Sequence, residues 1–441
     1  MSGYAERQFS DCATLVRNTV SANECSGRPY IGLEHIEEGS LRLAGVGNGV
    51  DISSQKTEFR TGDILFGKLR PYFRKVVRPR FDGVCSTDIW VVRAVDGVDQ
   101  GFLYYWMASR EFVESATRGS KGTKMPRADW GFVARCRLPV PPLPTQRRIA
   151  AILGSLDDKI ELNRRMSRTL EGMAQALFKS WFIDFDPVVA KAQGRLPRPT
   201  AEGKGEGLGG LPATIADLFP DRLVDSPLGP IPEGWEVKAI DQVTQVTKGR
   251  SYKSAELQPS DTALVTLKSF LRGGGYREDG LKPYVGKYKA EQAVRPGEIV
   301  VAMTDVTQNA DVIGRPAIVM PDARHGVLVA SLDTSIVRPT SATISTPFLY
   351  GLFSTEAFRA HTYAHSSGTT VLHLAKNAIP SFLFACPTEQ IQTAYLSHVE
   401  PMMARQQTLH RQNHSLAKLR DTLLPKLLSG EIEAPAVEEV A

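Results

Sequence analysis

Two clusters of basic residues carry the clearest chemical signal in this sequence. Seven Lys and Arg side chains lie within residues 60–80 and six within residues 117–137, with one acidic residue in each cluster. Three aromatic residues, Tyr72, Phe73 and Trp130, are interleaved with them. Cationic side chains neutralise backbone phosphates, and these contacts dominate affinity for nucleic acids. The composition is therefore typical of a surface that follows a nucleic-acid backbone.

Candidate DNA-binding residues can be named in both halves of the chain. In the first half they are Lys68, Arg70, Tyr72, Arg74, Lys75, Lys121, Lys124 and Arg127. In the second half they are Arg250, Tyr252, Lys253, Lys268, Arg272 and Arg277. We expect most of them to contact phosphates and one or two to reach guanine edges. The alternative is an ordinary solvated basic face, because most charge runs have no other role.

The sequence contains no complete motif for catalysis or for metal binding. The segment Gly119–Lys124 has the wrong spacing for a phosphate-binding loop. Asp184–Pro187 lacks the second proline with which amino-methyltransferases grip a flipped base. His361 and His365 are four residues apart, but Thr362 stands where a zinc protease needs glutamate. We therefore expect no catalytic residue, no metal site and no cofactor in this chain.

A weak internal duplication organises the chain. Five short segments recur in the same order with a nearly constant offset: Gly62–Ile64 and Gly297–Ile299, Asp88–Arg93 and Asp333–Arg338, Phe102–Tyr104 and Phe348–Tyr350, Gly122–Thr123 and Gly368–Thr369, and Thr145–Gln146 and Thr388–Gln390. Each copy begins with short β-rich runs bounded by turn residues and ends in a long helical pattern. The pattern predicts two related domains.

The two helical patterns predict long helices that pack against each other. Apolar residues from Ile149 to Trp181 recur at alternating steps of four and three, which is the period of a coiled coil. Thr145 is the expected N-cap of this helix. The second pattern, Ile391 to Leu423, is interrupted by Pro401, where we expect a kink or a break. The expected core of the pair consists of Leu156, Ile160, Asn163, Leu170, Leu177, Leu409, Leu416, Leu419 and Leu423.

Polar residues on the first helix leave two alternatives open. Asn163 either fixes the register of the pair, as a buried asparagine does in coiled coils, or lies at the edge of the stripe and faces water. Asp157 and Asp158 resemble a carboxylate pair, but their positions off the apolar stripe indicate a solvated helix face.

These elements predict an α+β chain with two mixed α/β recognition domains, related as a pseudo-two-fold repeat and separated by two long antiparallel coiled-coil helices. The expected boundaries are 1–143 for the N-terminal recognition domain, 144–184 for the first helix, 185–230 for a Pro/Gly-rich linker, 231–386 for the C-terminal recognition domain, 387–430 for the second helix and 431–441 for a tail. Antiparallel helices would give the repeat a two-fold relation that matches the local symmetry of duplex DNA. Because the halves differ in sequence, the expected target is bipartite and asymmetric.

Composition places further bounds on the protein. The apolar fraction of 42% is ordinary for a soluble protein, and no run of residues is long and apolar enough to span a bilayer. The N-terminus also lacks the pattern of a signal peptide. Five cysteines with no Cys-x-x-Cys pair argue against a disulfide framework and a zinc site. We expect a cytoplasmic protein without a membrane partner.

The helical segments resemble the specificity subunit of type I restriction–modification enzymes. The resemblance rests on Pro139–Ile149, Ile160–Arg165 and Leu177–Phe182 in the first copy, and on Leu416–Ile432 in the second. Ile231–Trp235 is similar to the opening of a target-recognition domain in that family. Thr145 departs from the family, which often has glutamate there.

The resemblance implies a division of labour among subunits. This chain would read double-stranded DNA and catalyse nothing. Two methyltransferase subunits would use S-adenosylmethionine to methylate a flipped adenine, and restriction subunits would use ATP and Mg²⁺ to translocate and cut DNA. A coiled-coil scaffold without DNA readout is the alternative, but it does not need the basic clusters. A self-contained nuclease is disfavoured by the missing acidic metal-binding motif.

Overall fold

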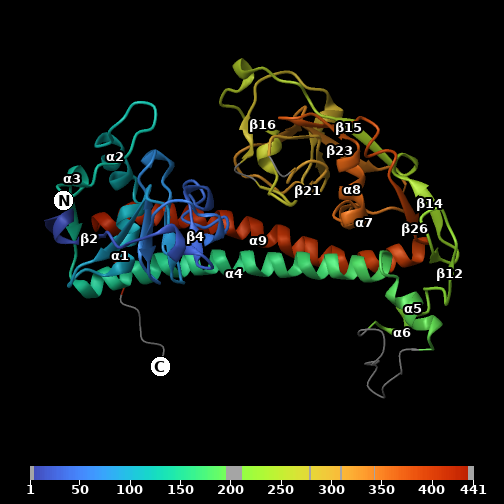
Figure 1. The fold of residues 1–441 in the computed structure, drawn as a ribbon, viewed down its shortest axis with the longest axis horizontal. Coiled ribbons are helices and arrows are strands. Elements are labelled where there is room, and N and C mark those ends of the chain that lie inside the picture. Colours follow the sequence, from blue (N-terminus) through green and yellow to red (C-terminus); the bar gives the residue numbers. More distant parts are fainter. Residues whose placement is uncertain (1–3, 195–210, 278–279, 308–309, 342, 436–441) are drawn as a thin grey trace. The chain divides into compact units, whose positions relative to one another are not determined.

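The computed structural model describes residues 4–194, 211–277, 280–307, 310–341 and 343–435. The chain forms two compact units, one made of residues 1–161 and 415–441 and the other of residues 162–414. We call them unit 1 and unit 2 (Figure 1). Part of the expected Pro/Gly-rich linker, including its glycine run at 203–210, lies outside the described residues. The rest of it contains the helices α5 (Asp186–Ala192) and α6 (Ala213–Ala216).

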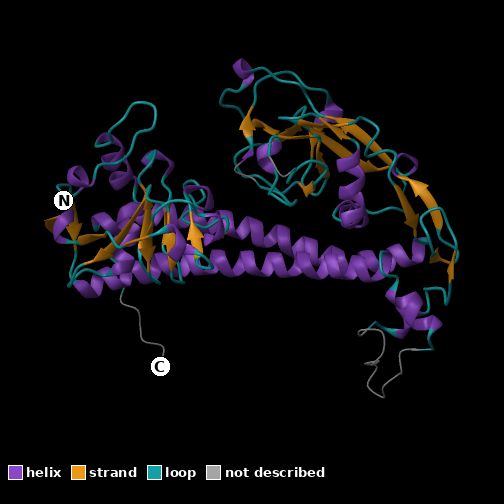
Figure 2. Cartoon of the chain, viewed as in Figure 1, coloured by secondary structure: helices purple, strands orange, loops and turns teal. Residues whose placement is uncertain are grey.

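Unit 1 is built from two main sheets and a set of helices (Figure 2). The antiparallel sheet has the strand order β2 (Ala13–Val16), β10 (Ile89–Ala94), β7 (Ile64–Gly67), β8 (Val76–Val77). The mixed sheet has the order β3 (Thr19–Val20), β6 (Lys56–Phe59), β9 (Gly83–Cys85), β4 (Pro29–Ile31), β5 (Gly47–Asn48). A separate pair joins β1 (Ala5–Gln8) to β11 (Arg137–Val140). The shorter helices are α1 (Gln100–Ala108), α2 (Arg110–Arg118) and α3 (Trp130–Val133).

Unit 2 repeats this arrangement. Its antiparallel sheet has the order β15 (Thr244–Lys248), β23 (Thr334–Pro339), β19 (Ile299–Ala302), β21 (Pro316–Ile318). Its mixed sheet has the order β17 (Lys282–Pro283), β16 (Thr262–Val265), β22 (Val327–Ala330), β18 (Ala293–Val294). The small sheets are β12 (Leu223–Val224) with β13 (Ile231–Pro232), β14 (Glu236–Ala239) with β26 (Leu383–Cys386), and β20 (Thr304–Asp305), β25 (Leu372–Leu374), β24 (Ser366–Ser367). The helices α7 (Thr346–Phe353) and α8 (Glu356–Ala364) correspond to α1 and α2.

The predicted duplication is confirmed by the strand pairing. In each unit the mixed sheet contains one parallel pair, β4 with β9 in unit 1 and β16 with β22 in unit 2. Helix capping is repeated as well, because Ser109 and Thr355 accept from the backbone of the third residue of α2 and α8. Such caps satisfy amide groups that have no partner within the helix. The two copies therefore share topology and local helix signals.

One repeated ion pair explains why the motif Gly-acid-Ile recurs with a downstream arginine. Arg93 donates to the two carboxylate oxygens of Asp63 at 2.6 and 2.8 Å. Arg338 donates to those of Glu298 at 2.7 and 3.0 Å. Each acid also accepts from a backbone N–H three residues earlier, at 2.7 Å in both units. Bidentate geometry of this kind fixes two neighbouring strands, β7 with β10 and β19 with β23.

The two long helices have the predicted lengths but different details. Helix α4 spans Leu143–Phe182 and α9 spans Glu389–Ser429. Helix α9 continues through Pro401, so the expected break there is wrong, and it also continues past Pro425. The neighbouring turns hold the helix on both sides of each proline. Thr145 is not the N-cap, because α4 begins at Leu143, and its hydroxyl instead accepts from Arg148 at 3.1 Å.

The helices pack against each other in antiparallel order. In unit 1, Arg420 donates to Asp157 at 2.7 Å. In unit 2, Asn163 donates to Asn413 at 3.0 Å. The later residue of α4 thus contacts the earlier residue of α9, as antiparallel packing requires. The expectation of an antiparallel pair is confirmed.

One alternative about the seam between these helices is decided, and one expectation is corrected. Asn163 is fully buried, with 0% exposure, so it does not face water; the side chains of Asn413 and Gln412 accept from its amide. Leu419 is 46% exposed, and the neighbouring Arg420 takes the buried position instead. A strict heptad drifts against the real helix period, which moves Leu419 out of the expected stripe.

The other predicted seam residues lie at or near the helix contact. Ile160 and Leu409 are buried. The half-buried ones are Leu156, Leu170, Leu177, Leu416 and Leu423. Leu177 packs against the core of unit 2 and Leu423 against that of unit 1. Among the described residues, no helix has the length and apolar character needed to cross a bilayer.

Asp157 does not belong to a solvated face. Its two oxygens accept from Arg420 and from the hydroxyl of Tyr105, both at 2.7 Å, and the side chain of Arg420 is almost completely buried. Burial alone would lower the pKa of Arg420, but Asp157 and Asp421 outweigh it and raise that pKa. Asp157 is therefore a structural anchor for α9 in unit 1. Its neighbour Asp158 is exposed and pairs with Arg80.

Candidate nucleic-acid interface

The two basic segments of the first half meet in space. The backbone N–H of Arg70 donates to the carbonyl of Pro126 at 2.7 Å, and that of Ala128 donates to the carbonyl of Lys68 at 2.8 Å. The loop between β7 and β8 therefore lies beside the hairpin formed by residues 121–127. The sequence separates these two segments by more than forty residues, so only the fold brings their cations together.

The hairpin presents its tip to solvent. Lys121 and Arg127 close it with two backbone hydrogen bonds of 2.9 Å each. Gly122 has φ = 93°, a conformation that favours glycine and turns the chain. The tip exposes Lys124 and the apolar side chain of Met125. Within unit 1 this loop, drawn in teal beyond α2, projects away from α4 (Figure 1).

Four of the predicted cations are held by partners within unit 1. Arg74 donates to the carbonyl of Ala108 at 2.6 Å, and Lys75 donates to that of Leu33 at 2.7 Å. Arg127 forms a bidentate pair with Asp88 at 2.8 and 3.0 Å, and Lys121 pairs with Asp129. All four side chains brace the loops, and acidic partners compensate the charges of Lys121 and Arg127. Their contribution to phosphate binding is expected to be smaller than their number suggests.

Four other predicted residues are open to a ligand. Lys68, Arg70 and Lys124 have no side-chain partner among the described residues, and Tyr72 is half exposed. Arg70 also has φ = 50°, a conformation that non-glycine residues rarely adopt. Backbone strain of this kind is concentrated at functional sites. These four residues form the best-supported part of the interface in unit 1.

The predicted residues of the second half stand on two segments. Arg250, Tyr252 and Lys253 follow β15, where Lys282 donates to the hydroxyl of Tyr252 at 3.3 Å. The Arg250 side chain is half-buried, and its Nε atom has no partner among the described residues. The other three, Lys268, Arg272 and Arg277, stand exposed on the loop after β16.

The loop after β16 is fixed to the loop after β19. The N–H of Gly273 donates to the carbonyl of Asp311 at 3.0 Å, and that of Gly275 donates to the carbonyl of Pro316 at 3.1 Å. Unit 1 has the same contact, since the N–H of Gly39 donates to the carbonyl of Phe73 at 3.0 Å. Each unit thus joins equivalent loops into one cluster, and both clusters carry predicted DNA-binding residues.

The sequence did not indicate which cations are compensated or which neighbours matter. Met125 was missed because it is apolar, although its place beside Lys124 in a Gly-rich loop was a usable signal. Asp88 and Asp129 were missed because their role depends on contacts that only the fold makes.

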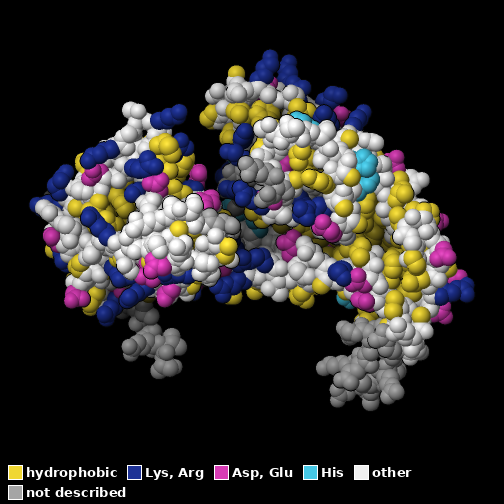
Figure 3. All heavy atoms as spheres, in the orientation of Figure 1, with side chains coloured by type: hydrophobic (Ala, Val, Ile, Leu, Met, Phe, Trp, Pro, Cys, Tyr) yellow, Lys and Arg dark blue, Asp and Glu magenta, His cyan; other side chains and the backbone are white. Residues whose placement is uncertain are grey.

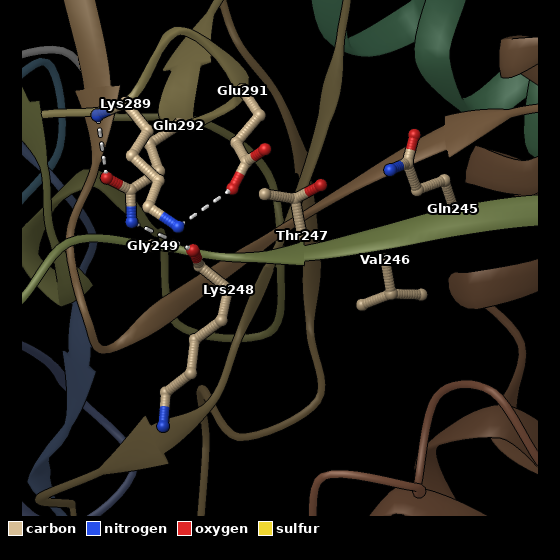
Figure 4. Close-up of a pocket in the computed structure, with 8 residues that line it drawn as sticks. All are labelled: Gln245, Val246, Thr247, Lys248, Gly249, Lys289, Glu291 and Gln292. Atoms are coloured by element: carbon tan, nitrogen blue, oxygen red, sulfur yellow. Dashed lines mark hydrogen bonds and ion pairs between the residues drawn. The ribbon is translucent and has the colours of Figure 1, made fainter.

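Two other surface features have different chemistry. A pocket of about 410 Å³ lies along β15 and is lined by Gln245, Val246, Thr247, Lys248, Gly249, Lys289, Glu291 and Gln292 (Figure 4). Its lining holds no histidine or cysteine, and the ammonium of Lys248 points away from Lys289 and Gln292. Hydrophobic side chains also gather over β12, β14 and β26, whereas Lys and Arg side chains are spread over both units (Figure 3).

Known proteins share this organisation. The family model for the type I restriction modification DNA specificity domain matches residues 24–171. The specificity subunit of the type I restriction enzyme HindI from Haemophilus influenzae is 25% identical over 98% of this chain and 100% of that protein. Residues 24–171 therefore match the specificity domain of this family, and nearly the whole chain is similar to specificity subunits of type I restriction enzymes. The resemblance noted in the helical motifs is confirmed.

Two further specificity subunits are similar to this one. That of the MjaIX enzyme from Methanocaldococcus jannaschii is 26% identical over 78% of this chain and 71% of that protein. The crystal structure of the type I specificity subunit from M. genitalium aligns with a TM-score of 0.50 and 14% identity, and the alignment covers 99% of this chain and 97% of that one. At 14% identity, the similarity to the M. genitalium structure concerns the fold alone. It agrees with the mixed helix-and-sheet fold described above.

Proposed function

We propose that this chain is the DNA-reading specificity subunit of a type I restriction–modification complex, with one half-site recognised by each unit. The observation that carries the proposal is the duplicated loop cluster, which presents open Lys and Arg side chains in both units. Because the cluster residues differ between the copies, the target is bipartite and asymmetric. The chain itself performs no catalysis in this proposal.

The proposed partners supply the chemistry. Two methyltransferase subunits would bind S-adenosylmethionine and methylate adenine, and flipping the base out of the duplex would give them access to it. Restriction subunits would contribute ATP-dependent translocation and Mg²⁺-dependent cleavage. These cofactors belong to the partners and not to this chain. Because the target is cellular DNA, the assembly would act in the cytoplasm. No feature of the fold favours the alternative of a scaffold without DNA readout.

The decisive experiment is methylation mapping of a reconstituted complex. The chain is co-expressed with its methyltransferase partners in a host that lacks adenine methylation, and methylated sites are mapped across the genome. We expect one bipartite motif, which disappears when this chain is omitted. The purified chain alone, supplied with S-adenosylmethionine or with ATP and Mg²⁺, is expected to show no turnover. Methylation without a defined motif, or turnover by the chain alone, would contradict the proposal.

A further inference from the structure

The loop after β7 in unit 1 has a residue-by-residue equivalent after β19 in unit 2. The carbonyl of Lys68 accepts from Ala128, and the carbonyl of Met303 accepts from Leu374, both at 2.8 Å. Lys68 and Met303 are also the first residues after the equivalent strands β7 and β19. The duplication therefore assigns a counterpart in unit 2 to each position at the start of the unit 1 loop.

The hairpins beside these loops are equivalent as well. Lys121 pairs with Arg127 in unit 1, and Ser367 pairs with His373 in unit 2, so each hairpin spans seven residues. In both, the second residue is a glycine with positive φ, 93° in unit 1 and 125° in unit 2. The tip sequence is Gly-Thr-Lys-Met in unit 1 and Gly-Thr-Thr-Val in unit 2. The same backbone frame thus carries different side chains.

The side chains differ most in charge. The unit 1 residues Lys68, Arg70, Lys121, Lys124 and Arg127 correspond to Met303, Asp305, Ser367, Thr370 and His373. No lysine or arginine of this set is kept in unit 2. A search for basic residues therefore could not find this part of unit 2, although its backbone is equivalent.

Both units expose one apolar residue on the loop and one at the hairpin tip. Unit 1 exposes Tyr72 to 50% on the loop and Met125 to 46% at the tip. Unit 2 exposes Val371 to 36% at the counterpart of Met125, and Val306 to 67% one position before the counterpart of Tyr72. Isolated apolar residues on a surface are ordinary. Here, however, the tip residues Met125 and Val371 are equivalent, and the pairing of Asp305 with Leu372 brings Val306 beside Val371.

Asp305 holds the unit 2 loop in shape. It is 1% exposed and accepts from the backbone N–H groups of Thr307 at 2.6 Å, Val312 at 2.6 Å and Ile313 at 2.9 Å. Burial alone would raise the pKa of Asp305, but these donors outweigh burial and hold that pKa below its usual range. The carboxylate is therefore committed to the backbone. It fixes the exposed Val306 beside it and leaves no charge for a ligand.

From this equivalence we infer that Val306, Thr370 and Val371 determine the half-site specificity of unit 2, with Asp305 as the residue that positions them. The inference rests on the proposed function and names residues that read the second half-site. Valine methyl groups can contact the methyl group of thymine, and a threonine hydroxyl can donate to or accept from a base edge. Lys268 and Arg272, on the adjoining loop, supply the contacts to phosphate.

The test exchanges the hairpin tips between the units. The double substitution Thr370→Lys with Val371→Met gives unit 2 the tip sequence of unit 1, and Lys124→Thr with Met125→Val makes the reciprocal change. Each variant complex is assembled with the methyltransferase partners, and methylation is mapped genome-wide. We expect the first variant to alter only one half-site of the motif and the second variant to alter only the other. A motif that Thr370→Lys with Val371→Met leaves unchanged would overturn the inference.

A milder variant guards against a tip exchange that blocks assembly. Val306→Ala removes two methyl groups from an exposed side chain and leaves the backbone intact. Methylation rates are compared on duplexes that carry one base change in either half-site. We expect at least a tenfold loss of discrimination in one half-site and no change in the other. Discrimination that matches the wild-type complex in both half-sites, or an equal loss in both, would contradict the inference. A wild-type complex without any motif would instead overturn the proposed function.

The positioning role of Asp305 has a separate readout. Asp305→Asn keeps the size of the side chain but weakens acceptance from Thr307, Val312 and Ile313. We expect faster hydrogen exchange at Val312 and Ile313 together with relaxed discrimination in the unit 2 half-site. The matched control is Asp311→Asn, a nearby acid that does not hold these amides. Faster exchange with unchanged discrimination would show that Asp305 is only structural and would remove it from the inference.

Discussion

Units 1 and 2 have the same scaffold and nearly opposite loop charges. Lys68 and Arg70 in unit 1 correspond to Met303 and Asp305 in unit 2. On the adjoining loop the positive charges belong to unit 2, since Glu34 and Glu38 of unit 1 correspond to Lys268 and Arg272 of unit 2. Each unit therefore has open cations in its loop cluster, but they stand on different loops.

The difference teaches where this fold tolerates change. The ion pairs Asp63–Arg93 and Glu298–Arg338 keep their geometry because each acid is shielded and ties two strands together. Most loop side chains have no such constraint, since their backbone is held largely by main-chain hydrogen bonds; Asp305, whose carboxylate holds three backbone N–H groups, is an exception. A recognition surface can thus diverge completely on a scaffold that is preserved.

The largest expected effect comes from breaking the shared ion pair. Arg93→Met leaves the buried carboxylate of Asp63 without its partner, and Arg338→Met does the same to the half-buried carboxylate of Glu298. We expect each substitution to lower the free energy of unfolding by about 3 kcal/mol, since unpaired buried charges are costly. Chemical denaturation measures the loss. Similar losses in both units would support the equivalence. Arg110→Met, which breaks a pair with an arginine side chain that is 92% exposed, is the control, with an expected loss of about 0.5 kcal/mol or less.

A second prediction separates open cations from compensated ones. Arg70→Glu with Lys124→Glu is expected to weaken DNA binding by the assembled complex and to reduce its salt dependence by about two phosphate contacts. Reversal at Arg110 and Arg137, which already pair with acids in unit 1, is the control. Fluorescence anisotropy across a salt series measures both quantities. Unchanged affinity and salt slope in the first variant would remove Arg70 and Lys124 from the interface.

A third prediction concerns the helices from which both units are built. Inserting one heptad near Met166 in α4 and another near Gln412 in α9 lengthens the helix pair by roughly 10 Å. That length equals about three base pairs of duplex DNA. We expect both half-sites to keep their sequence while the spacer between them grows. Methylation mapping that returns the original spacer would show that the helices do not set the distance.

The last prediction compares the polar contacts of the helix pair in the two units, and Asn163→Ala has the smallest expected effect. In unit 2, Asn163→Ala removes one neutral hydrogen-bonding side chain, and we expect a loss of about 1 kcal/mol in the free energy of unfolding. In unit 1, Arg420→Met leaves Asp157 without its cation, whereas Asp421 keeps Arg74, and we expect a loss of about 3 kcal/mol. Thermal and chemical unfolding of both variants tests the order. A larger loss for Asn163→Ala would contradict this ranking.

The sequence by itself determined the architecture. Repeated short motifs, apolar residues at heptad spacing and turn residues are local signals, and they indicated two related α+β domains and two long antiparallel helices. The basic segments at 60–80 and 117–137 were equally visible, because clusters of charge need no fold to be seen. The break expected at Pro401 is wrong, because α9 continues through this residue.

Only the tertiary structure decided which of those residues are available. The side chains of Arg74 and Lys75 donate to carbonyl groups of distant segments, whereas those of Arg70 and Lys124 have no partner among the described residues. Asn163 is buried by partners about 250 residues away in the chain. Val306 and Thr370 are brought together only by the pairing of β20 with β25. The physical reason is the same for all these residues. The sequence gives the charge or polarity of a side chain, but its partners and its exposure depend on long-range packing.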